Sequence, residues 1–97
     1  MEKIEAKSHL HPEGYIVESA NLLADAVLEF LRSQSEVEIS MIGMRGTSSS
    51  YFNTIIQRIV QEIGVEAMER RVKFIFDSNA QREIFGRSLA AVTKSVV

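Results

Sequence analysis

The sequence predicts an α/β domain in which a single-layer mixed sheet of about four strands carries amphipathic helices on one face. Two observations support this class. Short runs of β-forming residues alternate with longer segments whose apolar residues recur at helical spacing. In the middle of the chain, residues 38–52 read as a buried strand, a glycine-bracketed turn and the start of a helix. We expect one domain over residues 1–97, because this length allows a single modest core.

The N-terminal segment is expected to form a hairpin. Residues 4–10 and 15–18 resemble short strands, and residues 4–10 alternate imperfectly, as an edge strand does. Between them lie His11, Pro12, Glu13 and Gly14, which favour a turn because Pro presets one dihedral angle and Gly accepts a positive φ.

The first long helix is expected to start after Ser19, which can cap it, and to end near Gln34. Its apolar face has the spacing of Ala20, Leu23, Ala24, Val27, Phe30 and Leu31. Residues 37–42 then form a central strand.

The second long helix is expected to begin near Ser49 or Ser50 and to stop at Gly64. Residues 65–71 add one further helical turn, with Met68 pointing inward. Its apolar face carries Phe52, Ile55, Ile56, Ile59, Val60 and Ile63.

Residues 72–76 form the last strand, and Ser78 with Gln81 has the spacing of a capping box at the start of the last helix. Alternating strands and helices imply right-handed crossovers and a sheet that is largely parallel after the hairpin. The uncovered sheet face is then expected to be apolar enough for a homodimer.

Composition narrows the function classes. The formal net charge of −2 gives no basic footprint for nucleic acid. No apolar run approaches the roughly 20 residues that span a bilayer, so we expect no membrane partner. The absence of cysteine excludes disulfides and thiolate chemistry. The charged N-terminus does not resemble an export signal, which makes a cytoplasmic location the expectation.

The candidate site consists of Arg45, Gly46, Thr47, Ser48, Ser49 and Ser50. One hydroxyl is expected to cap the following helix, whose first turn has free N–H groups and a partial positive charge. That combination suits a bound anion or a phosphorylated serine, with Arg45 as the paired cation. A plain serine cap without ligand is the alternative. The spacing does not fit a phosphate-binding Walker loop or a dinucleotide motif.

Other chemistry-bearing residues are sparse. His9 and His11 stand one residue apart, but a solvated turn explains them better than a metal site. No paired carboxylates or catalytic triad stand out, so we expect neither an enzyme nor a cofactor.

The order of elements and the serine-rich stretch resemble the STAS-like domains, which are related to bacterial anti-sigma factor antagonists. The resemblance rests on residues 39–52, on the strand at residues 72–76 and on Arg87, Ser88 and Leu89. It implies a regulatory domain whose loop serine is phosphorylated by a histidine-kinase-like ATPase partner. Ser49 matches that serine best, with Ser48 and Ser50 as neighbours. Residues 46–47 here are Gly and Thr, where the family usually has an Asp before its serines.

Three functional hypotheses follow. The first is a non-catalytic module that binds a protein partner through the 46–52 loop and is switched at Ser49. The second is a sensor of a small ligand, a nucleotide or phosphate that uses the same helix N-terminus and Arg45. The third is a structural subunit that dimerises through its sheet.

Overall fold

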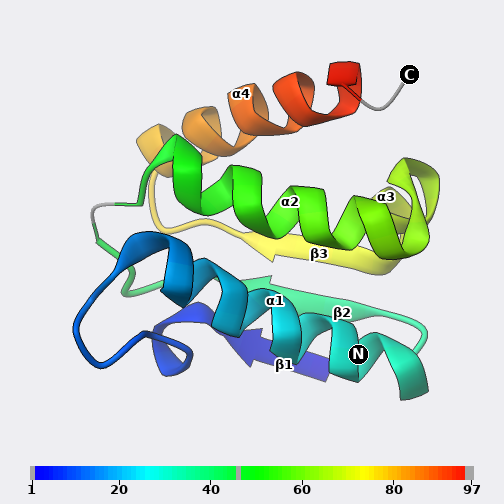
Figure 1. Ribbon diagram of the computed structural model, residues 1–97, viewed down its shortest axis with the longest axis horizontal. Coiled ribbons are helices and arrows are strands. Elements are labelled where there is room, and N and C mark those ends of the chain that lie inside the picture. Colours follow the sequence, from blue (N-terminus) through cyan, green and yellow to red (C-terminus); the bar gives the residue numbers. More distant parts are fainter. Residues whose placement is uncertain (1, 46, 96–97) are drawn as a thin grey trace.

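Three short strands and the helices that connect them form two layers (Figure 1). The computed structural model describes residues 2–45 and 47–95. Along the chain the elements are β1 (Glu2–Glu5), a 3-10 turn (Ala6–Ser8), α1 (Ile16–Ser33), β2 (Val37–Ser40), α2 (Ser49–Ile63), α3 (Val65–Arg71), β3 (Val72–Ile75) and α4 (Asn79–Ser95).

The sheet has the order β1-β2-β3, and both strand pairs are parallel. In register, Ile4 lies opposite Ile39, and Ile39 opposite Phe74. Helix α2 lies between α1 and α4, in front of the strands in Figure 1. This confirms the α/β class and corrects the mixed sheet of about four strands, because the described sheet has three strands and all of them are parallel.

The expected N-terminal hairpin is wrong. The turn itself forms, since the Gly14 N–H donates to the His11 carbonyl at 2.8 Å and Gly14 has φ +75°. The residues after it start α1 at Ile16 instead of a second strand. Ser19, the expected cap, is 3% exposed inside α1, and its Oγ accepts from the His11 N–H at 2.9 Å. The serine thus anchors the incoming loop to the helix.

The later elements follow the prediction closely. Helix α1 ends with Gln34 as its C-cap, α2 begins at Ser49, and Gly64 separates α2 from α3 at φ +86°. Strands β2 and β3 are shorter than expected. The Ser78 Oγ accepts from the Gln81 N–H at 3.1 Å, as a capping serine should.

The core fills the space between the helices and one face of the sheet. Side chains alternate along each strand, so every second strand residue points at the helices. The fully buried core side chains include Leu23, Val27, Val37, Ile39, Met41, Phe52, Ile55, Ile56 and Ile59. Near the β3 edge, Phe85 of α4 packs on Phe74 with ring centroids 4.5 Å apart.

The other sheet face is polar, contrary to expectation. Lys3, Glu38 and Lys73 form one row across the three strands, with the charges alternating in sign. The next row is Glu5, Ser40 and Ile75, where Ile75 is the single apolar residue. Because side chains alternate along each strand, the other apolar strand residues, Ile4, Val37, Ile39, Val72 and Phe74, lie on the helix side. This face offers no apolar dimer interface, and homodimerisation itself stays a prediction.

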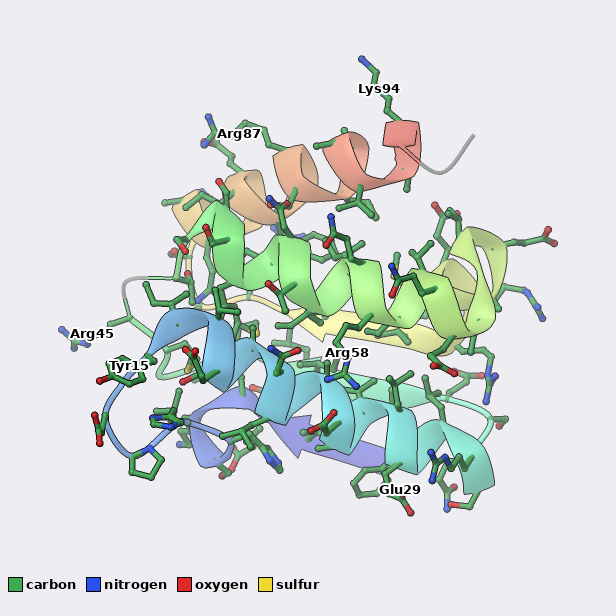
Figure 2. All side chains as sticks on the ribbon, viewed as in Figure 1. Tyr15, Glu29, Arg45, Arg58, Arg87 and Lys94 are labelled. Carbon is green, nitrogen blue, oxygen red and sulfur yellow. The ribbon has the colours of Figure 1, made fainter. Side chains whose placement is uncertain are left out.

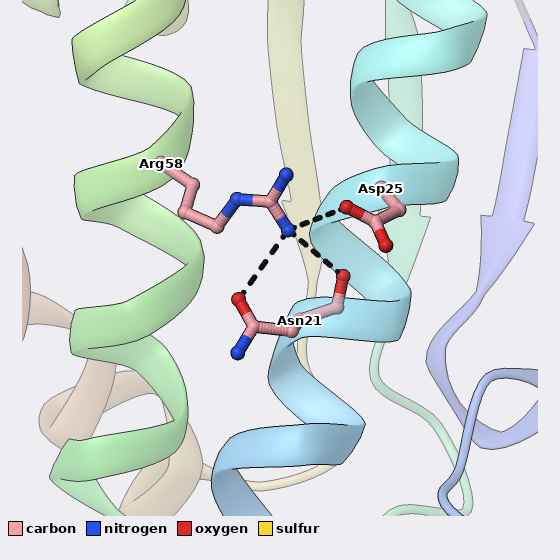
Figure 3. A network of polar contacts seen from close by, with 3 residues as sticks. All are labelled: Asn21, Asp25 and Arg58. Carbon is pink, nitrogen blue, oxygen red and sulfur yellow. Dashed lines mark hydrogen bonds and ion pairs between the residues drawn. The ribbon is translucent and has the colours of Figure 1, made fainter.

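Two arginines hold the helices to their neighbours. Arg58 of α2 forms an ion pair with Asp25 of α1 at 2.6 Å and donates to the carbonyl and the side-chain oxygen of Asn21 at 3.1 and 3.3 Å (Figure 3). At the C-terminus of α1, Arg71 donates to the carbonyl oxygens of Leu31, Gln34 and Ser35. Arg71 thereby satisfies acceptors that the end of a helix leaves free.

Candidate functional site

The connection between β2 and α2 lies at the carboxyl end of the sheet. A hydrogen bond to β3 holds its first residue in place, because the Met41 N–H donates to the Ile75 carbonyl at 2.8 Å. Gly43 has φ +86°, a conformation that favours glycine, and its N–H donates to the Asp77 carboxylate at 3.1 Å. The loop therefore leaves the strand along a defined path.

Helix α4 braces the same connection. Gln81 is 4% exposed, and its Nε2 donates to the Met41 carbonyl at 3.5 Å while its Oε1 accepts from the Asp77 N–H at 2.7 Å. The Ser88 hydroxyl donates to the Ser49 carbonyl at 3.4 Å. Sequence reasoning assigned Gln81 to a local cap and did not place it against Met41, because no spacing rule links residues 40 positions apart.

Ser48 is the residue that caps α2. Its Oγ accepts from the Tyr51 N–H at 3.4 Å, and its backbone is extended, as an N-cap requires. The N–H groups of Ser49 and Ser50 have no partner among the described residues. They form the donor-rich first turn that the sequence indicated.

The predicted site residues differ in exposure. Ser49 and Ser50 are exposed, whereas Thr47 and Ser48 are half-buried. Arg45 is exposed and points away from the body of the molecule (Figure 2), and it has no hydrogen bond or ion pair among the described residues. Gly46 lies outside the described residues. The two serines after the cap are thus open to solvent.

The loop that precedes α1 borders this site. His11 Nδ1 accepts from the Glu13 N–H at 3.1 Å, and the His11 ring stacks on Tyr15 with centroids 5.1 Å apart. These contacts hold the two ends of the turn together. In the part of the chain that the structure describes, no group of three His, Cys, Asp or Glu side chains could hold an ion.

A cavity of about 280 Å³ lies between this loop and the β2–α2 connection. The residues that line it include Leu10, Ile16, Met44, Arg45, Thr47 and Tyr51. Leu10 and Ile16 are 47% and 46% exposed, which is high for large apolar side chains. Sequence reasoning did not find the cavity, because it expected a strand where Ile16 opens α1.

Tyr51 is the unusual member of this wall. The residue is 2% exposed, and its hydroxyl is buried without a hydrogen-bond partner among the described residues. Burial raises the pKa of the Tyr51 hydroxyl well above its ordinary value, so the group stays protonated and remains a donor. A buried hydroxyl without a partner is uncommon in folded proteins and calls for an explanation.

Exposed apolar side chains surround the candidate site. Five large apolar side chains at this end are exposed, namely Leu10, Tyr15, Ile16, Val17 and Ile42. They belong to the segments that precede or open α1 and to the loop that follows β2. Figure 2 shows Tyr15 and Arg45 at the same end of the molecule. Exposed apolar residues that gather beside polar groups are typical of an interaction surface.

No helix in the described part of the chain combines the length and hydropathy needed to cross a bilayer. Comparison with known protein families, with characterised proteins and with solved structures finds no match to this chain. The STAS-like assignment therefore stays a prediction from residues 39–52 and from the order of elements.

Proposed function

We propose that the chain is a non-catalytic regulatory module that binds a protein partner at the carboxyl end of its sheet. The binding surface consists of Thr47, Ser48, Ser49 and Ser50 together with the exposed side chains of Leu10 and Ile16. Tyr51 and Phe52, which end the expected 46–52 stretch, are buried in the first turn of α2 and lie outside this surface. Phosphorylation of Ser49 is the switch, and the STAS-like resemblance favours a histidine-kinase-like ATPase as the partner.

The observation that carries this proposal is that two adjacent serines have different roles: Ser48 caps α2 and Ser49 is exposed. Ser48 is half-buried and its hydroxyl is already engaged in capping α2, so a kinase would have to displace that contact to reach it. Ser49 is exposed, and its hydroxyl has no partner among the described residues. A kinase can therefore modify Ser49 without breaking a contact that the fold uses.

Phosphate on Ser49 would change the surface strongly. It adds roughly −1.5 to −2 charges beside the first turn of α2, where free N–H groups and the helix dipole stabilise an anion. The same charge lies next to exposed apolar side chains that a partner would cover. Because burying an unpaired charge is costly, the modified module should release its partner.

The test uses the ATPase encoded by a neighbouring gene, incubated with the chain and ATP and followed by intact-mass spectrometry. We expect one added phosphate on the wild type, none on Ser49→Ala, and one on the matched control Ser50→Ala. Ser49→Glu should weaken binding of the ATPase, and Ser33→Glu, at the far end of α1, should not. A chain that carries no phosphate on residues 48–50 after this incubation would remove the switch from the proposal.

A second candidate, the sensor of phosphate or a nucleotide, is supported by the unpartnered Arg45 beside the free N–H groups of Ser49 and Ser50. A thermal-shift series with phosphate and nucleotides tests it. A saturable shift that Arg45→Ala abolishes and Arg87→Ala preserves favours this function, since Arg87 is an exposed arginine on α4 away from the site (Figure 2).

A further inference from the structure

The two edges of the sheet differ in what they present. In the described part of the chain, β1 and β3 lie on opposite sides of β2, so each has a neighbouring strand on one side only (Figure 1). Strand β1 has the sequence EKIE, and charged side chains are a common protection of an edge against further pairing. Strand β3 has the sequence VKFI, with Lys73 as its single charge. The β3 edge is therefore the one that is more open to another strand.

The backbone groups of Phe74 face this open edge. The Ile75 carbonyl accepts from the Met41 N–H, which follows β2, so Ile75 turns its own N–H and carbonyl toward β2. Because these groups point to opposite sides at successive residues of a strand, the N–H and the carbonyl of Phe74 point away from β2. An unpaired donor and acceptor at a strand edge form a template for a further strand.

Apolar side chains line the same edge on its helix side. A cavity of about 260 Å³ lies there between α3, β3 and α4. The rings of Phe74 and Phe76 are stacked with centroids 6.0 Å apart, and both contact Phe85 of α4. All three rings line the cavity and are only half-buried, so they keep apolar surface that a partner could cover.

One register of pairing with a second copy of β3 suits these features. In an antiparallel pair centred on Phe74, the two Phe74 residues exchange both of their outward N–H···O bonds. Lys73 then lies opposite Ile75 of the second copy, and its hydrocarbon stem covers the apolar side chain that stands alone in its row of the polar sheet face. A pair centred on Lys73 would instead oppose two like charges and would need backbone groups that already face β2.

Charges at the two ends of β3 favour the antiparallel direction. Glu69 of α3 lines the cavity beside Val72, where β3 begins. Arg82 of α4 lies over the Phe76 ring, 5.1 Å from its centroid, just after β3 has ended. Neither charged side chain has an ion-pair partner among the described residues. Antiparallel pairing places the end of one β3 beside the start of the other, which brings Arg82 of each copy near Glu69 of the other.

We propose that the chain forms a two-fold symmetric homodimer in which the β3 strands of two copies pair antiparallel around Phe74. The two three-stranded sheets then become one continuous sheet. Phe74, Phe76 and Phe85 of both copies meet on its helix side, and an Arg82–Glu69 pair lies at each end of the interface. Because both β3 edges are used, the assembly stops at two copies. The interface uses residues outside the serine loop, so the inference does not depend on the proposed function.

Sedimentation equilibrium of the full chain over a concentration series measures the mass in solution, and we expect a reversible dimer. Glu69→Arg and Arg82→Glu should each raise the dimer dissociation constant about tenfold, because each variant opposes like charges at both ends of the interface. The double variant, with both substitutions, should recover most of this loss. Glu62→Arg on α2 and Arg87→Glu on α4 are the matched controls, exposed and outside the cavity at the β3 edge, and should leave the constant unchanged.

Disulfide cross-linking tests the register, and the absence of cysteine from the chain leaves no background reaction. The Lys73→Cys and Ile75→Cys variants are mixed in equal amounts in a buffer of oxidised and reduced glutathione. They should form a covalent dimer, because opposite residues of an antiparallel pair have Cα atoms about 4.5–5.5 Å apart, within the reach of a disulfide. Lys3→Cys mixed with Ile75→Cys is the matched control, since Lys3 lies in the row of Lys73 but on β1. This control mixture should form little covalent dimer.

Three results would overturn the inference. The first is a monomer at every concentration up to about 1 mM, where even weak specific pairs associate. The second is a dimer whose dissociation constant does not respond to Glu69→Arg and Arg82→Glu, or a charge-exchanged double variant that recovers nothing. The third is equal cross-linking of Ile75→Cys with Lys73→Cys and with Lys3→Cys. A single variant that loses the dimer but keeps the circular dichroism spectrum of the wild type has lost the interface and not the fold, which supports the inference.

Discussion

Replacing Arg71 should reveal how much the end of α1 depends on a side chain from another helix. Arg71 Nη2 donates to the carbonyls of Leu31 and Gln34 at 2.8 and 3.1 Å, and Nε donates to that of Ser35 at 2.9 Å. Its positive charge also lies at the negative end of the α1 dipole. Arg71→Ala removes all of these interactions at once.

The magnitude follows from the burial of each bond. We assign about 1 kcal/mol to the partly buried bond to Leu31 and about 0.5 kcal/mol to each of the two exposed bonds, which gives about 2 kcal/mol. With a urea m-value of about 1–2 kcal/mol/M, the unfolding midpoint should fall by about 1–2 M. This is a large part of the stability of a domain of this size.

The assay is urea unfolding followed by circular dichroism, with Arg70→Ala as the matched control. Arg70 is the neighbouring arginine, exposed and without a bond to α1 among the described contacts. Its replacement should change the free energy of unfolding by no more than about 0.5 kcal/mol. Arg71→Lys should recover less than half of the loss, because an ammonium group cannot span three carbonyls. Equal effects of Arg71→Ala and Arg70→Ala would refute the capping role.

Three further predictions concern two glycines and one ionisable group. Gly64→Ala should lower the free energy of unfolding by about 1–3 kcal/mol, since φ +86° with ψ 162° is nearly restricted to glycine. Gly86→Ala should raise it by about 0.5–1 kcal/mol, because Gly86 lies in α4 with open space around it. Both changes are measured by the urea assay. If Gly64→Ala is as stable as the wild type, the assigned backbone is wrong. Above a pH of about 10, unfolded Tyr51 loses its proton while the folded residue keeps it, so stability declines with rising pH. Tyr51→Phe should flatten this decline in thermal melts, and an unchanged slope would contradict the burial of the hydroxyl.

The sequence predicted most of the architecture from Ser49 onward, because local signals dominate there. The Gly64 stop, the extra turn with Met68 and the Ser78 cap each depend on residues a few positions apart. The N-terminal hairpin failed for a comparable reason. The turn residues 11–14 were recognised correctly, but a turn does not determine whether a strand or a helix follows, and the β-branched pair Ile16 and Val17 misled the assignment.

The site was predicted in part. The sequence predicted that one hydroxyl of residues 47–50 caps α2, and in the structure Ser48 is that residue. The cavity, the buried hydroxyl of Tyr51 and the brace from Gln81 could not be predicted, because each needs contacts between segments far apart in the chain. The polar sheet face was missed because strand length and alternation, rather than overall apolar content, decide what a face presents.

The parallel order of the strands places two kinds of feature at opposite poles of the domain. The stabilising corner of Arg71 and Gly64 sits where β2 and β3 begin, and the serine loop with its cavity sits where β1 and β2 end. Substitutions at one pole should therefore leave the other unaltered, as sites without shared contacts usually behave additively. Stabilising substitutions near Arg71 and Gly64 could therefore be combined with changes to the binding residues of the serine loop, without the second set altering the effect of the first.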